Sequence, residues 1–430
     1  MRSRPTAPIA SLVALPGRSL ALGLHVGLGR VLGLGRTLRL SLVLALGLGL
    51  GLGLVSCRAE SPIDPLQREP ALLFEGPALL RFLERASTLA DTPAGRATAK
   101  LRSRLEGCRE VAFSLPKPAT PPSAPVPALE ALACREASGL TPALAAHLER
   151  ARGAHAGVLQ WPIGERGRLE LRFDVDAAGG LALVGRLEAD EAMGALAFLL
   201  PAAEPPAPAR IDAARTLVHL HLRSASGTGL AALVPKDGQA DRLFALKGRL
   251  LEGALLEGTL ELAFVEPVPD GQVPLAVLAV HHRGAAPIEA ALAEALGQLE
   301  STWSIVPAPR RFGGANGLAL DGGCYADLPL LPELAPCWVV TPDALLVGYR
   351  AEAIEAVLAE SAKPSEASGL VVDLERVRSL DRRLVAAQTE VAGAGPWPAR
   401  VADLYSRLEL RGATAEDGAI ELSGRLEARP

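Results

Sequence analysis

Aromatic residues are scarce in this chain: Phe, Trp and Tyr together account for 3% of its 430 residues. Binding of single-stranded nucleic acids without sequence preference depends on stacking bases against aromatic rings. The chain therefore has few residues with which to build a stacking surface for bases or sugars. It also lacks the Gly-x-Ser-x-Gly motif that places the nucleophilic serine of many hydrolases on a sharp turn.

Acidic residues are absent from the first 56 positions, which instead contain six arginines. Residues Leu40–Val55 then consist of Leu, Val, Ala and Gly with a single Ser. A basic start followed by a short apolar stretch is typical of a secretory signal peptide. The stretch is shorter than the roughly 20 residues of a membrane-spanning helix, and its alternating glycines disfavour a helix further. The alternatives are an uncleaved N-terminal anchor and a signal peptide without lipid.

The apolar stretch ends in Leu54-Val55-Ser56-Cys57, which resembles the lipobox of bacterial lipoproteins. The resemblance implies that residues 1–56 are a signal peptide, that cleavage occurs before Cys57, and that Cys57 carries acyl chains such as palmitate. Two or more acyl chains anchor a protein stably, so the membrane is an expected partner. Arg58 rather than Asp follows the cysteine, which in this family favours the outer membrane facing the periplasm. Residues 57–70 contain three prolines and are expected to form a tether.

Removal of the signal peptide makes the mature chain more acidic. The full chain has a net charge of −4, and loss of the six arginines leaves −10. A negative surface repels the phosphate backbone of nucleic acids. We therefore expect no nucleic-acid partner.

Four cysteines remain beyond Cys57, and an even number of cysteines outside the cytoplasm is typical of disulfides. Of the three possible connectivities we expect the local one, Cys108–Cys134 and Cys324–Cys337, with each bond stabilising the fold by about 3 kcal/mol. The alternative is a metal site. The absence of Cys-x-x-Cys spacing and of nearby histidines disfavours it.

Residues 168–189 and 407–428 form an internal repeat that aligns without a gap. Apolar and charged residues alternate in both copies, and a Gly-Gly or Asp-Gly pair interrupts the alternation, which predicts two β-hairpins. Charges along one face predict an antiparallel sheet that is covered on one side only. The repeat suggests two related modules, residues 71–265 and 266–430. The alternative is one continuous sheet running through both.

Amphipathic segments between the predicted strands favour helices. A helical spacing of apolar residues follows Pro77, follows Pro287, and recurs from Ile354 to Leu358. The predicted fold class is α+β, with antiparallel, hairpin-rich sheets and helices packed on one face.

His219 and His221 lie two residues apart in a predicted strand, so their imidazoles share a face. Such a pair can form half of a metal site, with His281 or His282 as the third ligand. The alternative is a solvent-facing edge of the strand, with Leu220 turned to the core. We expect neither a bound metal nor a cofactor.

Tyr325, Trp338 and Tyr349 lie in a proline-rich segment that also holds the last two cysteines. This segment can form a rigid apolar surface for a ligand or a partner. The alternative is a loop that a disulfide holds in place and that leads into a hairpin.

These patterns favour a non-enzymatic lipoprotein of the cell envelope that acts as a scaffold or binds an envelope protein. One alternative is a periplasmic carrier of lipid or another apolar ligand, held between a leucine-rich sheet and its helices. Another is a secreted hydrolase, although no complete catalytic motif is visible in the sequence.

Overall fold

The computed structural model describes residues 66, 69–88, 93–114, 132–163, 167–188, 201–202, 204–223, 256–265, 275–303, 306–314, 319–325, 335–359, 368–387 and 402–430. The predicted signal peptide, Cys57 and most of the predicted tether lie outside these residues.

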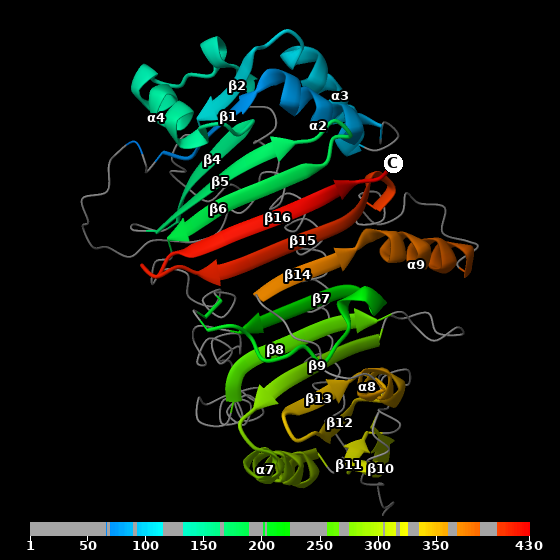
Figure 1. Ribbon diagram of the computed structural model, residues 1–430. Coiled ribbons are helices and arrows are strands. Elements are labelled where there is room, and N and C mark those ends of the chain that lie inside the picture. The colour runs from blue at the N-terminus through cyan, green and yellow to red at the C-terminus, as the bar shows by residue number, and fades with distance from the viewer. Residues whose placement is uncertain are drawn as a thin grey trace, which may run out of the picture. The chain divides into compact units, whose positions relative to one another are not determined.

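The described strands form one antiparallel sheet of 16 strands (Figure 1). Their order across the sheet is β10-β11-β12-β13-β9-β8-β7-β14-β15-β16-β6-β5-β4-β1-β2-β3. In chain order the strands are β1 (Ala71–Glu75), β2 (Glu110–Ser114), β3 (Ala133–Cys134), β4 (Gly157–Ile163), β5 (Gly167–Val175), β6 (Leu181–Glu188), β7 (Thr216–Arg223), β8 (Leu256–Val265), β9 (Leu275–His282), β10 (Ala308–Gly313), β11 (Ala319–Cys324), β12 (Cys337–Val340), β13 (Ala344–Gly348), β14 (Ser368–Asp373), β15 (Tyr405–Thr414) and β16 (Ile420–Ala428).

The helices connect these strands, and three of them, α2, α7 and α8, are those predicted from the apolar spacing. None of the helices described has the length and hydrophobicity that crossing a bilayer requires. The α-helices are α2 (Gly76–Ser87), α3 (Pro93–Leu105), α4 (Pro142–Arg152), α7 (Ala285–Trp303), α8 (Ala351–Leu358) and α9 (Leu374–Ala387), with short 3₁₀ helices η3 (Arg135–Ala137) and η5 (Ala213–Arg215).

Helix α4 shows how local sequence sets a helix start. Thr141 precedes the helix, and its side chain accepts a hydrogen bond from the backbone N–H of Leu144. Pro142 occupies the first turn, where its missing N–H leaves no hydrogen bond unmade. The helix then buries Leu144 and Leu148 against the sheet.

The two predicted hairpins are β5–β6 and β15–β16, and they lie side by side (Figure 1). Strand β16 pairs with β6, so the second strands of the two repeats meet. In this pairing Val184 lies opposite Ser423, which occupies the same position in the second repeat. The two hairpins are therefore arranged about a local two-fold axis, as two copies of one hairpin would be in a symmetric dimer.

The strands of the two halves follow the same topology on either side of this axis, with the last strand of each half next to the axis. The order reads β6-β5-β4-β1-β2-β3 in one direction and β16-β15-β14-β7-β8-β9 in the other, with β10 to β13 added beyond β9. The predicted division between residues 265 and 266 falls between β8 and β9, which are hydrogen-bonded neighbours. The described residues thus form the continuous sheet that the sequence left open as an alternative.

The helices lie on both faces of the sheet. On β9, Val277 and Ala279 pack with Ile354 of α8, whereas Val280 packs with Ile288 of α7. Neighbouring residues of a strand point to opposite faces, so α7 and α8 cover opposite sides. The prediction that helices pack on one face only is therefore wrong. Strand β9 is apolar on both faces, and both need cover.

Both disulfides are the local ones expected from the sequence. Cys108, just before β2, is bonded to Cys134 at the end of β3. Cys324 and Cys337 are bonded across β11 and β12, where they lie directly opposite each other. Each bond therefore links segments that the sheet already brings together.

We expect Gly185→Ala to destabilise the centre of the sheet. A Cβ atom at Gly185 would lie 2.4 Å from the carbonyl oxygen of Glu170 and 2.4 Å from a methyl carbon of Leu171. The strands would have to shift, which lowers the free energy of unfolding by about 1–3 kcal/mol. Gly297→Ala is the matched control, because Gly297 lies in α7 with open space around it. That change should raise the free energy of unfolding by up to about 1 kcal/mol. Urea denaturation measures both, and equal effects would contradict the packing described here.

Candidate functional site

A cluster of ionisable side chains lies buried in the middle of the sheet, on β7, β8 and β9. It consists of His219 and His221 from β7, Glu261 from β8 and His281 from β9, and each is at most 5% exposed. The strand pairing places Glu261 directly opposite His221 on one side. The same register turns all four side chains to one face of the sheet.

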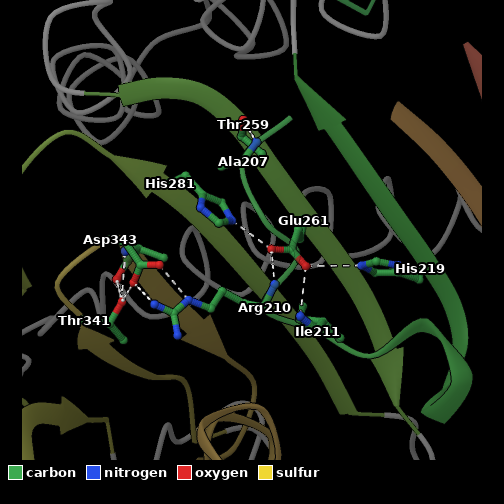
Figure 2. A network of polar contacts seen from close by, with 10 residues as sticks. Ala207, Arg210, Ile211, His219, Thr259, Glu261, His281, Thr341 and Asp343 are labelled. Atoms are coloured by element: carbon green, nitrogen blue, oxygen red, sulfur yellow. Dashed lines mark hydrogen bonds and ion pairs between the residues drawn. The ribbon is translucent and has the colours of Figure 1, made fainter. Parts of the chain in front are cut away.

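Glu261 is the centre of this cluster (Figure 2). Its Oε1 atom accepts hydrogen bonds from His281 Nε2 at 2.8 Å and from the backbone N–H of Arg210 at 2.8 Å. Its Oε2 atom accepts from His219 Nε2 at 3.3 Å and from the backbone N–H of Ile211 at 3.0 Å. Both carboxylate oxygens are thus satisfied without water, as a buried charge requires.

The two backbone donors belong to a segment that crosses over β8. We call residues 204–212 the strap. The Ala207 N–H in the strap donates to the hydroxyl of Thr259 at 3.1 Å, two residues before Glu261 on the same face of β8. The side chain of Ile211 is buried in the hydrophobic core beneath α8. Side chains of β8 therefore hold the strap against the sheet.

An ion pair extends the network from the strap to the turn before β13. Arg210 Nε donates to Asp343 Oδ2 at 2.8 Å, and the Thr341 hydroxyl donates to Asp343 Oδ1 at 2.9 Å (Figure 2). Burial by itself raises the pKa of Asp343, but the hydrogen bonds from Arg210 and Thr341 hold it below its usual value. Arg210 is thereby fixed at both its backbone and its side chain.

The electrostatics of the cluster favour a charged Glu261 and a neutral His221. Burial raises the pKa of Glu261, but the hydrogen bonds from His219, His281 and the Arg210 backbone outweigh it and hold the pKa well below the usual value. Burial lowers the pKa of His221 to about 4. The rings of His219 and His221 are stacked, with centroids 6.0 Å apart.

Corresponding positions in the other half of the sheet are apolar. In the two-fold arrangement, β7 corresponds to β1 and β8 corresponds to β2. The registers of the paired strands then show which residues of the two halves correspond. The positions of His219, His221 and Glu261 are occupied there by the fully buried residues Ala71, Leu73 and Ala112. This strand arrangement therefore packs well without charges, so the cluster is not a requirement of the fold.

The structure corrects one expectation for the histidines and supports another. His219 and His221 share a face, as the sequence predicts, but the alternative of a solvent-facing edge is wrong, because the strap and the sheet bury both rings. His281 joins them through Glu261, whereas His282 points to the opposite face and bonds the Thr341 carbonyl at 3.1 Å. Within the described residues, no group of three or more His, Cys, Asp or Glu has a metal-binding arrangement.

Two parts of the cluster were missed from the sequence. Glu261 stands alone in an otherwise apolar stretch of β8, and that isolation is the signal that could have drawn attention to it. The strap is the second, because its prolines, Pro205, Pro206 and Pro208, are typical of a loop and do not indicate what it contacts. Its contact with β8 joins residues about 50 positions apart, which no local pattern reveals.

The predicted aromatic surface is partly assembled in the structure. Tyr325 and Trp338 are in contact, with ring centroids 5.4 Å apart. Trp338 also packs against the core beneath α7. Tyr349 follows β13 and is 37% exposed. The binding role of these three residues stays a prediction.

The chain was compared with known protein families, with curated proteins and with solved structures, and none of the three comparisons finds a match. Any proposal about function therefore rests on the chemistry of the described residues.

Proposed function

We propose that this protein is a non-enzymatic lipoprotein of the bacterial envelope that serves as a scaffold and binds a protein partner. In this proposal acyl chains on Cys57 hold it at the outer membrane, facing the periplasm. Two related modules, one ending at β6 and one ending at β16, form a single platform. The proposal departs from a module boundary at residue 265, because β7 and β8 belong with β9 and β14 in the strand order.

The observation that carries the proposal is a strip of charged side chains on the central strands β5, β6, β16 and β15. The strand registers turn these side chains to one face of the sheet. Arg411 and Arg425 are 67% and 66% exposed, and Val184, on the far side of Ser423 from Arg411, is 43% exposed. We call the following residues the charged strip: Arg168, Glu170, Arg172, Arg186, Glu188, Arg407, Glu409, Arg411, Arg425 and Glu427.

Helices cover the same face on either side of the charged strip. Helix α4 packs over β1 and β4, where Val158 shares a face with Arg172, its neighbour across the strands. Helix α8 packs over β9 and β13 at the other side. The strip between them stays accessible, and its arginines pair with its own glutamates. A surface of mixed charge suits a protein partner of mixed charge, since such pairing sets orientation and specificity.

The buried cluster supports a non-enzymatic role. Glu261 and His281 have the residue types of an acid–base pair, but they are 0% and 1% exposed. A substrate must come within hydrogen-bond reach of a general acid or base. The strap occupies the position next to Glu261 that a substrate would need.

The lipid anchor makes a direct prediction. Cells expressing the full chain and fed radioactive palmitate should label it, and Cys57→Ser should remove the label, because the thiol is the acceptor. Cys324→Ser is the matched control and should keep the label, since that cysteine pairs with Cys337. An unlabelled parent chain would overturn the proposed anchor and compartment.

The charged strip predicts a contact in intact cells. A photo-reactive residue at Ser423, which is exposed at the centre of the strip, should form one discrete cross-linked adduct. The same group at Val306, which is 63% exposed and outside the strip, should not form that adduct. Arg411→Glu with Arg425→Glu should weaken the adduct, because the charge pattern is reversed. Identical adducts from both positions would contradict a specific docking surface.

A second candidate function is a carrier of lipid or another apolar ligand. On the opposite face, the neighbouring strands β7, β14, β15 and β16 carry leucines that are only half-buried: Leu220, Leu370, Leu410, Leu422 and Leu426. A run of partly exposed leucines on adjacent strands is a candidate contact surface for a ligand or partner.

Mass spectrometry of gently purified protein separates the carrier from the scaffold. A carrier should retain a lipid, and Leu410→Asp should lower its occupancy, because a buried charge opposes an acyl chain. Val184→Asp places the same charge on the opposite face and should leave occupancy unchanged. Protein free of lipid would rule out the carrier and leave the scaffold proposal in place.

A further inference from the structure

Side chains of β8 bond the backbone N–H groups of the strap, and Arg223 of β7 adds a hydrogen bond to the Pro205 carbonyl at 3.1 Å and an ion pair with Glu204. Pro205, Pro206 and Pro208 have no backbone N–H, so the strap cannot join the sheet as an additional strand. The backbone N–H of Ala207 donates a hydrogen bond to the hydroxyl of Thr259, and those of Arg210 and Ile211 donate to the carboxylate of Glu261. His221 is also hydrogen-bonded to the backbone of Ala207. The histidine–glutamate cluster is thus the surface on which the strap rests.

The ionisable groups that face Glu261 come from every element around it. Strand β7 contributes His219 and His221, and β9 contributes His281. The strap contributes Arg210, whose guanidinium is already paired with Asp343.

The remaining charged neighbours on this face are paired, since Arg223 of β7 bonds Glu204 of the strap, and the others are uncharged or turned away. Strand β14 places Gly369 and Val371 beside the histidines of β7. Helix α8 buries Ala353 and Ile354, while its Glu355 pairs with Arg310. The net charge of the cluster is therefore set by one carboxylate and three imidazoles.

We propose that His219, His221, His281 and Glu261 form an acid-sensitive latch, which holds the strap on the sheet at neutral pH and releases it in acid. At neutral pH, His219 and His281 each donate one hydrogen bond to the carboxylate, which also accepts the two strap N–H groups. Added protons place surplus positive charge, or a neutral carboxyl group, at a site without solvent. Such a site disfavours uncompensated charge. Lifting the strap admits water and relieves the imbalance.

The direction of the pH effect follows from the protonation states of the closed strap. His221 has a pKa of about 4 when buried and 6.5 when exposed. The open state therefore binds a proton more readily as the pH falls from 6.5 towards 4, and acid favours opening. Glu261 acts in the same direction. Its pKa is lowered in the closed state, so it stabilises the closed state at pH values above 4.5, its ordinary pKa, and this stabilisation is lost as the pH falls below 4.5.

The apolar residues at corresponding positions supply the decisive variant. Leu73 occupies in β1 the position that His221 occupies in β7, and it is fully buried there. His221→Leu therefore removes one titrating group and replaces it with a side chain that this strand arrangement accommodates. If packing alone held the strap, His221→Leu would leave the pH dependence of strap opening unchanged.

Hydrogen–deuterium exchange of the full protein, read in peptides covering the strap, tests the latch. Between about pH 7.5 and about pH 5, and after correction for intrinsic rates, strap protection should fall at least about tenfold while β9 and β13 stay protected. His221→Leu should keep the strap protected at the lower pH. Glu261→Gln should expose it at both, because an amide cannot accept all four hydrogen bonds.

The controls decide between a latch and general acid unfolding. His155 lies near the protein surface and pairs with Asp174, so His155→Gln should respond to pH as the parent chain does. Equal strap protection at both pH values in the parent chain would overturn the proposal. So would loss of protection in β9 and β13 together with the strap, or unchanged acid opening in His221→Leu. Strap protection in His221→Leu decides the question even where Glu261→Gln does not fold.

Discussion

The ladder of backbone hydrogen bonds between β6 and β16 is the interaction on which this architecture depends. It joins the two hairpin repeats, and every other strand extends from one of them. Without it, the sheet would have two additional open edges, each a row of unpaired backbone groups. The symmetric register, with Val184 opposite Ser423, lets two copies of one sequence pattern close each other's edge.

Within this sheet the Glu261 cluster is a local exception to apolar packing. Removing a charge from water is unfavourable unless the charge is paired and hydrogen-bonded. Glu261 meets that condition with four donors, two of them from the strap. The corresponding strands of the other half use Ala71, Leu73 and Ala112 instead. Charge at this place therefore ties the strap to the sheet, which an alanine or a leucine cannot do.

Much of the fold could be predicted because its signals are local. Alternation of apolar and charged residues marks β5, β6, β15 and β16, and helical spacing marks α2 and α8. The cysteine spacing led to the two local disulfides. The face covered by α7 was missed, because an apolar strand does not reveal from its sequence which helix covers each side.

The candidate site shows where sequence reasoning ended. The shared face of His219 and His221 follows from strand geometry alone, so it could be predicted. Their burial could not, since it depends on a strap and on β8, which the chain brings together across long separations. By itself the sequence determined the elements and the pairing of neighbouring ones, because those depend on residues a few positions apart. Only the tertiary structure decided that the Glu261 carboxylate on β8 bonds side chains of β7 and β9 and the backbone of the strap, because such contacts form when the sheet is complete.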